Sequence, residues 1–203
     1  MIAALPSELL KSLRLTLVIA VVTGLMYPLL VTGVGQLIFP SQANGSLVTR
    51  NGQVIGSSLI GQYFTSANYF HGRVSATVNP STAKAEPFAA ENSAGSNYGP
   101  TNQALIDRVK ADVAKLRQEN GLGPNDPIPV DLVTADFSGL DPNISEAGAL
   151  LQVNRVASAR SLDPSRVRAL VESMVQGRIL WVFGEPHVNV LQLNLALDDG
   201  EAG

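Results

Sequence analysis

The sequence contains no cysteine among its 203 residues and only two histidines. Without cysteine there can be no disulfides, cysteine nucleophiles, thiolate metal sites or lipid-modified lipoprotein cysteine. A catalytic zinc site needs three protein ligands, usually with two or more histidines, so the distant His71 and His187 make a metal site an unfavoured prediction. The net charge of -3 offers no basic face, and we expect no binding to nucleic acid.

Charged residues are also missing from the whole stretch between Arg14 and Arg50. Residues 15–39 form an apolar run of roughly 25 residues, and about 20 suffice for a helix to cross a bilayer. We therefore predict a transmembrane helix over residues 15–39. One alternative is a signal peptide cleaved near Ala43, but such an apolar region covers only ~7–15 residues. The other is a buried core helix, which would show one apolar stripe instead of being apolar all round.

The predicted transmembrane helix carries small and polar residues that a plain anchor does not need. Thr16, Ala20 and Gly24 follow one another at intervals of four, so a second helix can approach closely on that face. Pro28 removes a backbone hydrogen bond and is expected to kink the helix. Gln36 is costly in lipid unless it lies at the interface or faces a protein. We predict packing against a partner helix, although glycine and proline are also simply common in membrane helices.

Basic residues on the two sides of the span predict its orientation. Lys11 and Arg14 precede the span, and only Arg50 lies close behind it. The positive-inside rule therefore places the N-terminus in the cytoplasm and the C-terminal domain outside. The expected parts are a short cytoplasmic N-terminus (1–14), a transmembrane helix (15–39) and one extracytoplasmic domain (40–203).

Turn, cap and apolar patterns predict an α+β fold, with one N-terminal transmembrane helix followed by a single mixed α/β soluble domain. Asn51-Gly52 lies between two short apolar runs and predicts a β-hairpin. Cap and stop residues predict three helices, over 102–121, 146–160 and 164–177. Val188–Leu197 alternates between apolar and polar residues, which predicts a half-buried strand.

Motifs for common enzyme chemistries are absent from the sequence. There is no GxxxxGK[ST] phosphate loop and no GxGxxG fingerprint after a strand. The loop from Gly95 to Asn102 is the nearest approach to an anion cradle, because it leads into a helix N-terminus. An ordinary helix cap is the favoured alternative for that loop. A serine hydrolase that uses Ser138, Asp141 and His187 stays open, although no GxSxG elbow occurs.

Blocks of residues along nearly the whole chain resemble those of one family. They include Thr23-Gly24, Tyr27-Pro28-Leu29, Gln36, Leu59-Ile60-Gly61-Gln62, Gly72-Arg73, Gly99-Pro100-Thr101-Asn102, Ser138-Gly139-Leu140-Asp141-Pro142, Arg155-Val156-Ala157 and Gly184-Glu185-Pro186. By these blocks the chain resembles the C subunits of bacterial Kdp potassium-transporting ATPases, the KdpC family. Several blocks in one order are far more specific than any single block.

The resemblance implies an accessory, non-catalytic subunit of a high-affinity, ATP-driven potassium importer in the bacterial inner membrane. The implied partners are a channel-like potassium-binding subunit, a P-type ATPase subunit and a very small stabilising subunit, besides membrane lipid. The family's C subunit is described as needed for assembly and as a catalytic chaperone that raises the ATP affinity of the ATPase subunit. A domain outside the membrane could instead cap the potassium entrance. No cofactor is expected on this chain, because ATP and potassium are handled by the complex.

Two sets of residues are candidates for contact with partners or ligands. The helix set is Thr16, Ala20, Gly24, Pro28 and Gln36. The loop set comprises Gly95, Ser96, Asn97, Gly99, Thr101, Asn102, Ser138, Gly139, Asp141, Gln152, Arg155 and Glu185. From residue type alone, Glu185 is expected to be a solvated turn carboxylate. For Arg155 and Arg160 a solvated helix face is favoured over a partner contact.

Overall fold

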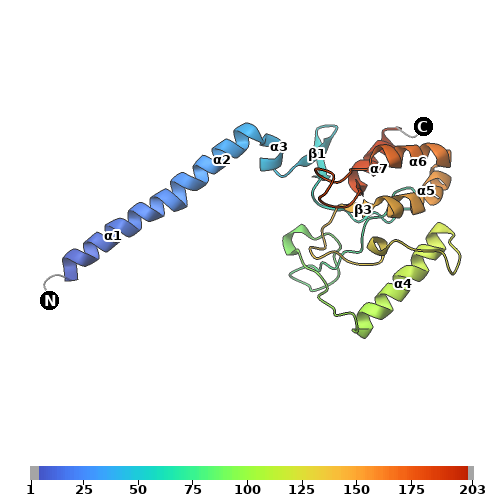
Figure 1. Ribbon diagram of the computed structural model, residues 1–203, viewed down its shortest axis with the longest axis horizontal. Helices are drawn as coiled ribbons and strands as arrows, with labels where there is room; N and C mark the ends of the chain where they lie inside the picture. Colours follow the sequence, from blue (N-terminus) through green and yellow to red (C-terminus); the bar gives the residue numbers. More distant parts are fainter. Residues whose placement is uncertain (1–4, 201–203) are drawn as a thin grey trace. The chain divides into compact units, whose positions relative to one another are not determined.

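A computed structural model describes residues 5–200 of the chain (Figure 1). Residues 1–4 of the expected N-terminal segment and residues 201–203 of the expected domain lie outside the described residues. The chain divides into two compact units, Met1–Val54 and Ile55–Gly203. Helices and two small two-stranded sheets make up the regular structure, which confirms the α+β fold class.

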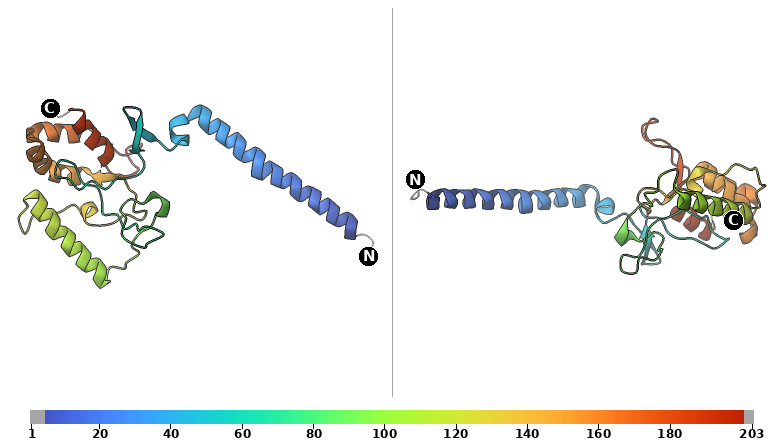
Figure 2. Two further views of the ribbon diagram at one scale, coloured as in Figure 1. Left: turned by 180° about the vertical axis from the view of Figure 1, so that it is seen from behind. Right: turned by 90° about the horizontal axis from the view of Figure 1, so that it is seen from below.

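One long apolar helix, Pro6–Ile38, dominates the first unit. It is made of α1 (Leu5–Val21), the π-helical turn η2 (Val22–Met26) and α2 (Tyr27–Ile38), which run on continuously in both views of Figure 2. A short helix, α3 (Pro40–Ala43), follows. The helix Pro6–Ile38 is long and apolar enough to cross a membrane, and no residue in its most apolar stretch is buried. A core helix would bury at least one stripe, so the buried-core alternative does not fit.

The π-helical turn ends at Met26, two residues before Pro28, where the sequence predicts a kink. The amide of Tyr27 donates to the carbonyl of Val22, five residues back instead of four. Such a turn holds one extra residue, so the residues after it are rotated about the helix axis relative to those before it. Thr16 and Ala20 therefore precede the change in register, whereas Pro28 and Gln36 follow it.

Local hydrogen bonds satisfy two polar side chains of this helix, those of Thr23 and Gln36. Thr23 Oγ1 donates to the carbonyl of Ile19 at 2.8 Å. The side-chain amides of Gln36 and Asn44 bind each other, with N–O distances of 3.2 and 3.0 Å. Because Asn44 lies beyond the apolar helix, Gln36 has a hydrogen-bonding partner within the chain at the end of the span.

The predicted hairpin is confirmed. Its strands are β1 (Leu47–Arg50) and β2 (Gln53–Ser57), which form a two-stranded sheet. The turn residues Asn51 and Gly52 have φ of 52° and 77°. This left-handed backbone at both positions explains the Asn-Gly pair, since other residues adopt it rarely.

The second unit is built from short elements around α5. They are η3 (Ala90–Asn92), α4 (Gln103–Asn120), η4 (Val130–Leu132), β3 (Asn143–Ser145), α5 (Glu146–Arg160), α6 (Pro164–Ser173), β4 (His187–Asn189) and α7 (Val190–Asp198). Strands β3 and β4 pair antiparallel, with Ile144 opposite Val188. Helix α5 packs against α4, α6 and both of these strands (Figure 1).

Side-chain caps confirm the starts of the three predicted helices. Asn102 accepts from the amide of Ala104, Ser145 from Gly148, and Asp163 from Ser165. Each cap satisfies an amide that has no partner in the first turn. Gly121 ends α4 with a φ of 64°, as predicted.

Two predicted boundaries near the C-terminus are wrong. The predicted strand over Val188–Leu197 ends at Asn189, whose side chain accepts from the amide of Gln192 and starts α7. A short apolar run fits both helical and strand periods, and leucine and the cap favour the helix. Helix α6 ends at Ser173 instead of Gly177. The backbone of Gln176 pairs with that of His187 and so cannot continue the helix.

The core of the second unit is mostly aliphatic. Its fully buried apolar side chains include Ile144, Val153, Val156, Val167, Val171, Val188 and Leu193. Phe70 is also fully buried, although it belongs to a stretch without helix or strand. Burying one such side chain contributes about 1.5–3 kcal/mol, so the core fixes the position of Phe70.

Candidate functional site

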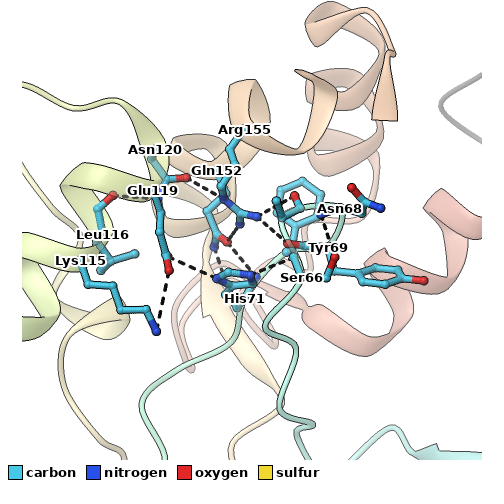
Figure 3. A network of polar contacts seen from close by, with 12 residues as sticks. Ser66, Asn68, Tyr69, His71, Lys115, Leu116, Glu119, Asn120, Gln152 and Arg155 are labelled. Atoms are coloured by element: carbon cyan, nitrogen blue, oxygen red, sulfur yellow. Dashed lines mark hydrogen bonds and ion pairs between the residues drawn. The ribbon is translucent and has the colours of Figure 1, made fainter. Parts of the chain in front are cut away.

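The segment Ser66–His71 is surrounded by polar side chains from the helices (Figure 3). It forms neither helix nor strand, and its residues pass from exposed at Ser66 to buried at Phe70, so the backbone groups near Phe70 need other partners. Gln152 of α5, which is fully buried, provides two of them. Its Oε1 accepts from the amide of His71 at 2.8 Å, and its Nε2 donates to the carbonyl of His71 at 3.1 Å.

Arg155 of α5 binds three separate parts of the second unit. Its Nη1 donates to the carbonyls of Ala67 and Tyr69 at 2.8 and 3.0 Å. Its Nε donates to Asn120 Oδ1 at the end of α4, at 3.1 Å. Its Nη2 donates to Gln152 Oε1 at 2.6 Å. A planar guanidinium with five N–H groups suits such a set of fixed acceptors.

Arg160, near the end of α5, holds the other end of the segment. Its Nε donates to the carbonyl of Asn68 at 2.6 Å, and its Nη2 donates to Asp198 Oδ1 at 2.7 Å. Its guanidinium lies 4.8 Å from the ring centre of Tyr69, within the range of a cation–π contact. The solvated helix face predicted for Arg155 and Arg160 is therefore wrong, because both side chains bind the segment.

Helix α7 binds Phe70 in the same way as α5 binds His71. Asn194 is buried, accepts from the amide of Phe70 at 2.8 Å and donates to its carbonyl at 3.0 Å. His71 Nε2 donates to the carbonyl of Ser66 at 3.0 Å, so all six carbonyls of the segment accept a hydrogen bond from a side chain. We call the segment and its partners Gln152, Arg155, Arg160 and Asn194 the polar clamp.

His71 also lines a cleft beside α4 with a volume of about 180 Å³. Its Nδ1 lies 3.6 Å from Glu119 Oε2, and Lys115 Nζ lies 3.8 Å from Glu119 Oε1. Burial is the largest cause that lowers the pKa of His71, and Arg155 adds to it. The carbonyl of Ser66 and the charge of Glu119 oppose them, but the pKa stays below 6.5. His71 is therefore neutral at neutral pH.

The cleft differs from a nucleotide or metal site. Typical small-molecule pockets measure roughly 300–1,000 Å³, well above this volume. Its walls carry charges of both signs, from Arg73 and Lys115 and from Asp112 and Glu119. Arg73 Nη1 is paired with Asp141 Oδ2 at 3.1 Å. Within residues 5–200, no group of three or more His, Asp or Glu side chains is placed to hold a metal ion.

Two of the predicted contact loops lie against each other. The amide of Ala94 donates to the carbonyl of Ser138 at 2.9 Å. A Cβ atom on Gly95 would lie 2.9 Å from the carbonyl oxygen of Phe137, so this close approach requires glycine. The loops at Gly95 and Ser138 are therefore in contact, although the sequence analysis did not predict that they lie together.

Asp136 organises the loop that contains Ser138 and Gly139. Its Oδ2 accepts from the amides of both residues at 2.8 and 2.9 Å, and from the hydroxyl of Ser138. Burial alone raises the pKa of Asp136, but these hydrogen bonds and the charge of Arg73 outweigh burial and lower it. Sequence reasoning missed this role, because an aspartate in a loop gives no sign of which amides it binds.

The remaining predicted loop residues have local roles. Asn102 caps α4, while Asn97 and Thr101 are exposed, so a ligand at this loop stays a prediction. Glu185 is exposed, as expected, and its carboxylate pairs with Arg178 at 2.5 Å. Of the loop set, only Gln152 and Arg155 belong to the polar clamp.

The three residues of the hydrolase alternative do not form a triad. The hydroxyl of Ser138 donates to Asp136, whereas Asp141 accepts from Arg73. His187 Nδ1 contacts a backbone carbonyl two residues earlier in the chain, at 2.9 Å. A triad needs the histidine beside the serine hydroxyl, and here each residue has a different partner.

We predict that Arg155→Ala destabilises the second unit by about 1–3 kcal/mol, because it removes the donor from the half-buried carbonyl of Tyr69 and from Asn120 Oδ1. Unfolding of the full chain in detergent, followed by circular dichroism, measures the change. Arg168→Ala, at an exposed position of α6, is the matched control and should stay within about 0.5 kcal/mol of wild type. An Arg155 variant as stable as the control would contradict the clamp.

We also predict that His71 makes the stability of this unit depend on pH. The unfolded chain binds a proton at this residue near pH 6.5, whereas the folded chain does so only at lower pH. Stability from this group is therefore complete above that value and is lost as pH falls through the folded pKa. His71→Asn should flatten the decline in denaturant titrations relative to wild type. An unchanged slope in His71→Asn would refute the assignment.

The sequence is similar to that of known proteins over nearly its whole length. Residues 9–199 match the family described as "KdpC: K+-transporting ATPase, c chain". The potassium-transporting ATPase KdpC subunit of Methylobacterium nodulans is 56% identical over 200 residues, covering 94% of this chain and 98% of that protein. The subunit of the same name from Bradyrhizobium diazoefficiens is 52% identical over 200 residues, covering 96% and 98%. The matched region contains the polar clamp and all of the long helix from residue 9 onward, and the chain belongs to the KdpC family.

Proposed function

We propose that the chain is an accessory, non-catalytic subunit of an ATP-driven potassium importer, anchored in the membrane by α1 to α2. The observation that carries this proposal is the match of residues 9–199 to the c chain of a K+-transporting ATPase. The polar clamp supports a structural role, because its charged side chains bind the chain's own backbone. A reactive serine is not supported, since Ser138 is bound to Asp136.

The proposed partners are the other subunits of the same complex, as the family resemblance implies. They are a channel-like potassium-binding subunit, a P-type ATPase subunit that carries out catalysis, and a very small stabilising subunit. Thr16, Ala20 and Gly24 are the proposed contact with a partner helix, because small residues allow close approach of two backbones in lipid. The domain is proposed to lie outside the membrane and to cap the potassium entrance.

An effect on ATP affinity does not require this chain to touch ATP. On the proposed orientation the domain lies outside the membrane, while ATP is in the cytoplasm. A subunit that binds the ATP-bound form of its partner more tightly raises the partner's ATP affinity by the same factor, because coupling is reciprocal. We therefore propose that any chaperone effect passes through contacts between subunits.

We predict that Gly24→Leu weakens assembly without unfolding this chain. A Cβ atom at Gly24 meets nothing within 4 Å, so a larger side chain can disturb only a partner. A loss of about 1.4 kcal/mol of packing would reduce co-purification of the larger ATPase in mild detergent roughly tenfold. Gly33→Leu, at an equally open position off this face, is the control.

The two parts of this experiment test different claims. If wild type brings down no multi-pass ATPase, the proposed function is wrong. If Gly24→Leu and Gly33→Leu co-purify equally well, only the proposed contact face is wrong.

We predict that alkaline phosphatase fused after Gly203 is active, because that enzyme works outside the cytoplasm. The physical reason is the excess of basic residues before the span, from Lys11 and Arg14. A reporter that works only in the cytoplasm should be inactive at the same position. The opposite pair of activities would reverse the topology and put the domain on the side of ATP.

A further inference from the structure

Between α6 and β4 the chain exposes a continuous apolar run that the proposed function does not use. Residues 179–183, Ile-Leu-Trp-Val-Phe, all have exposed side chains, from 63% for Phe183 to 91% for Trp181. We call them the apolar tip. In the right-hand view of Figure 2 the segment stands off from the helices of the second unit. Single exposed apolar residues are normal on soluble domains, but five in succession mark an interaction site.

A short hairpin stem holds the apolar tip away from the core. The backbones of Gln176 and His187 exchange two hydrogen bonds, of 2.8 and 3.1 Å. Closer to the tip, Arg178 Nη2 and Glu185 Oε2 form an ion pair of 2.5 Å across the stem. The two charges that flank the tip therefore compensate each other, and no residue between them is charged.

Most backbone amides of the tip are satisfied within it. Ile179 and Phe183 exchange two hydrogen bonds of 2.9 Å. The amide of Trp181 donates to the carbonyl of Arg178, and that of Val182 to Ile179, both at 3.2 Å. A partner that bound by strand addition would need free backbone groups. With four of its five amides already used, the tip offers a partner mainly its apolar side chains.

We propose that the apolar tip inserts into the boundary between headgroups and acyl chains of the bilayer that holds the chain's own helix. The hydrocarbon core accepts backbone groups only when they are satisfied internally, whereas the boundary with the headgroups still holds water. Four of the five tip amides are satisfied, and the carbonyls of residues 180–182 suit this hydrated boundary. Tryptophan and other aromatic residues are favoured at this boundary. A protein pocket is the competing occupant, and it usually contacts polar as well as apolar side chains, whereas the five side chains of the tip are all apolar.

The inference rests on the proposed membrane anchor. Once the helix is in the bilayer, insertion of the tip is an intramolecular event at high effective concentration. A tip of five residues therefore suffices, although it would bind a membrane only weakly by itself. The inference holds for either orientation of the chain, because both leaflets have the same kind of boundary.

Trp181 is the only tryptophan of the chain, so its fluorescence reports on the tip alone. We expect the full chain in phosphatidylcholine vesicles with brominated acyl chains to lose Trp181 emission relative to unbrominated vesicles. The double variant Leu180→Ser and Val182→Ser should recover that emission. Phe137→Ser, at an exposed apolar position elsewhere, is the control and should be quenched like wild type. Equal emission of wild type in both vesicles would overturn the proposal.

A second measurement uses the complex in native membranes. A photo-crosslinking phenylalanine derivative is placed at Val182, and adducts are identified by mass after carbonate washing. A lipid adduct is the expected result, whereas an adduct with another polypeptide would overturn the proposal in favour of a protein partner. A chain that stays in the washed membrane without any adduct refutes only this inference. A chain that is washed out refutes the anchor as well.

Discussion

The second unit depends on hydrogen bonds from side chains to the backbone of Ser66–His71. Each of the six carbonyls in this segment accepts one. A neighbouring strand usually supplies such partners, but the sheets of this chain have only two strands each. Leaving a buried backbone group without a partner costs about 1–3 kcal/mol, so the amide and guanidinium side chains of α5 and α7 do here what a strand does elsewhere.

This arrangement also explains why α5 is central. Val153 and Val156 are fully buried in the aliphatic core, whereas Gln152 and Arg155 bind the segment. Because a helix has 3.6 residues per turn, neighbouring positions on α5 can point in different directions, some into the aliphatic core and some toward the segment. Phe70 enters the core from the segment itself, so the polar and apolar contacts fix the same stretch of chain. Gln152 Oε1 accepts from both the His71 amide and Arg155 Nη2. Hydrogen bonds that share an acceptor behave as a network, in which losing one donor affects the others.

Much of the fold could be predicted from the sequence where the deciding interactions are local. The caps at Asn102 and Ser145 bind amides two or three residues away, and the Asn51-Gly52 turn needs only its own backbone conformation. The helix α7 could not be predicted in this way. The run from Val188 fits both the helical and the strand period, and the cap at Asn189 together with packing decides that it forms a helix.

The candidate site was only partly predictable for the same reason. Gln152 and Arg155 were singled out as candidate contact residues, yet their partners in the segment Ser66–His71 lie 81 to 88 residues away. An arginine on a helix looks the same in sequence whether it faces water or a backbone carbonyl. Asn194 and Asp136 gave no sign at all, because each is recognised only by the amides that it binds in the folded chain.

The clamp has a consequence for the order in which the chain matures. The hydrogen bonds of Phe70 reach across 124 residues to Asn194 in α7, the last helix of the described chain. Synthesis proceeds from the N-terminus at about 5–20 residues per second, so the apolar helix emerges seconds before α7 exists. On the proposed anchoring, insertion of this helix precedes folding, and the second unit cannot complete its clamp until translation is nearly finished.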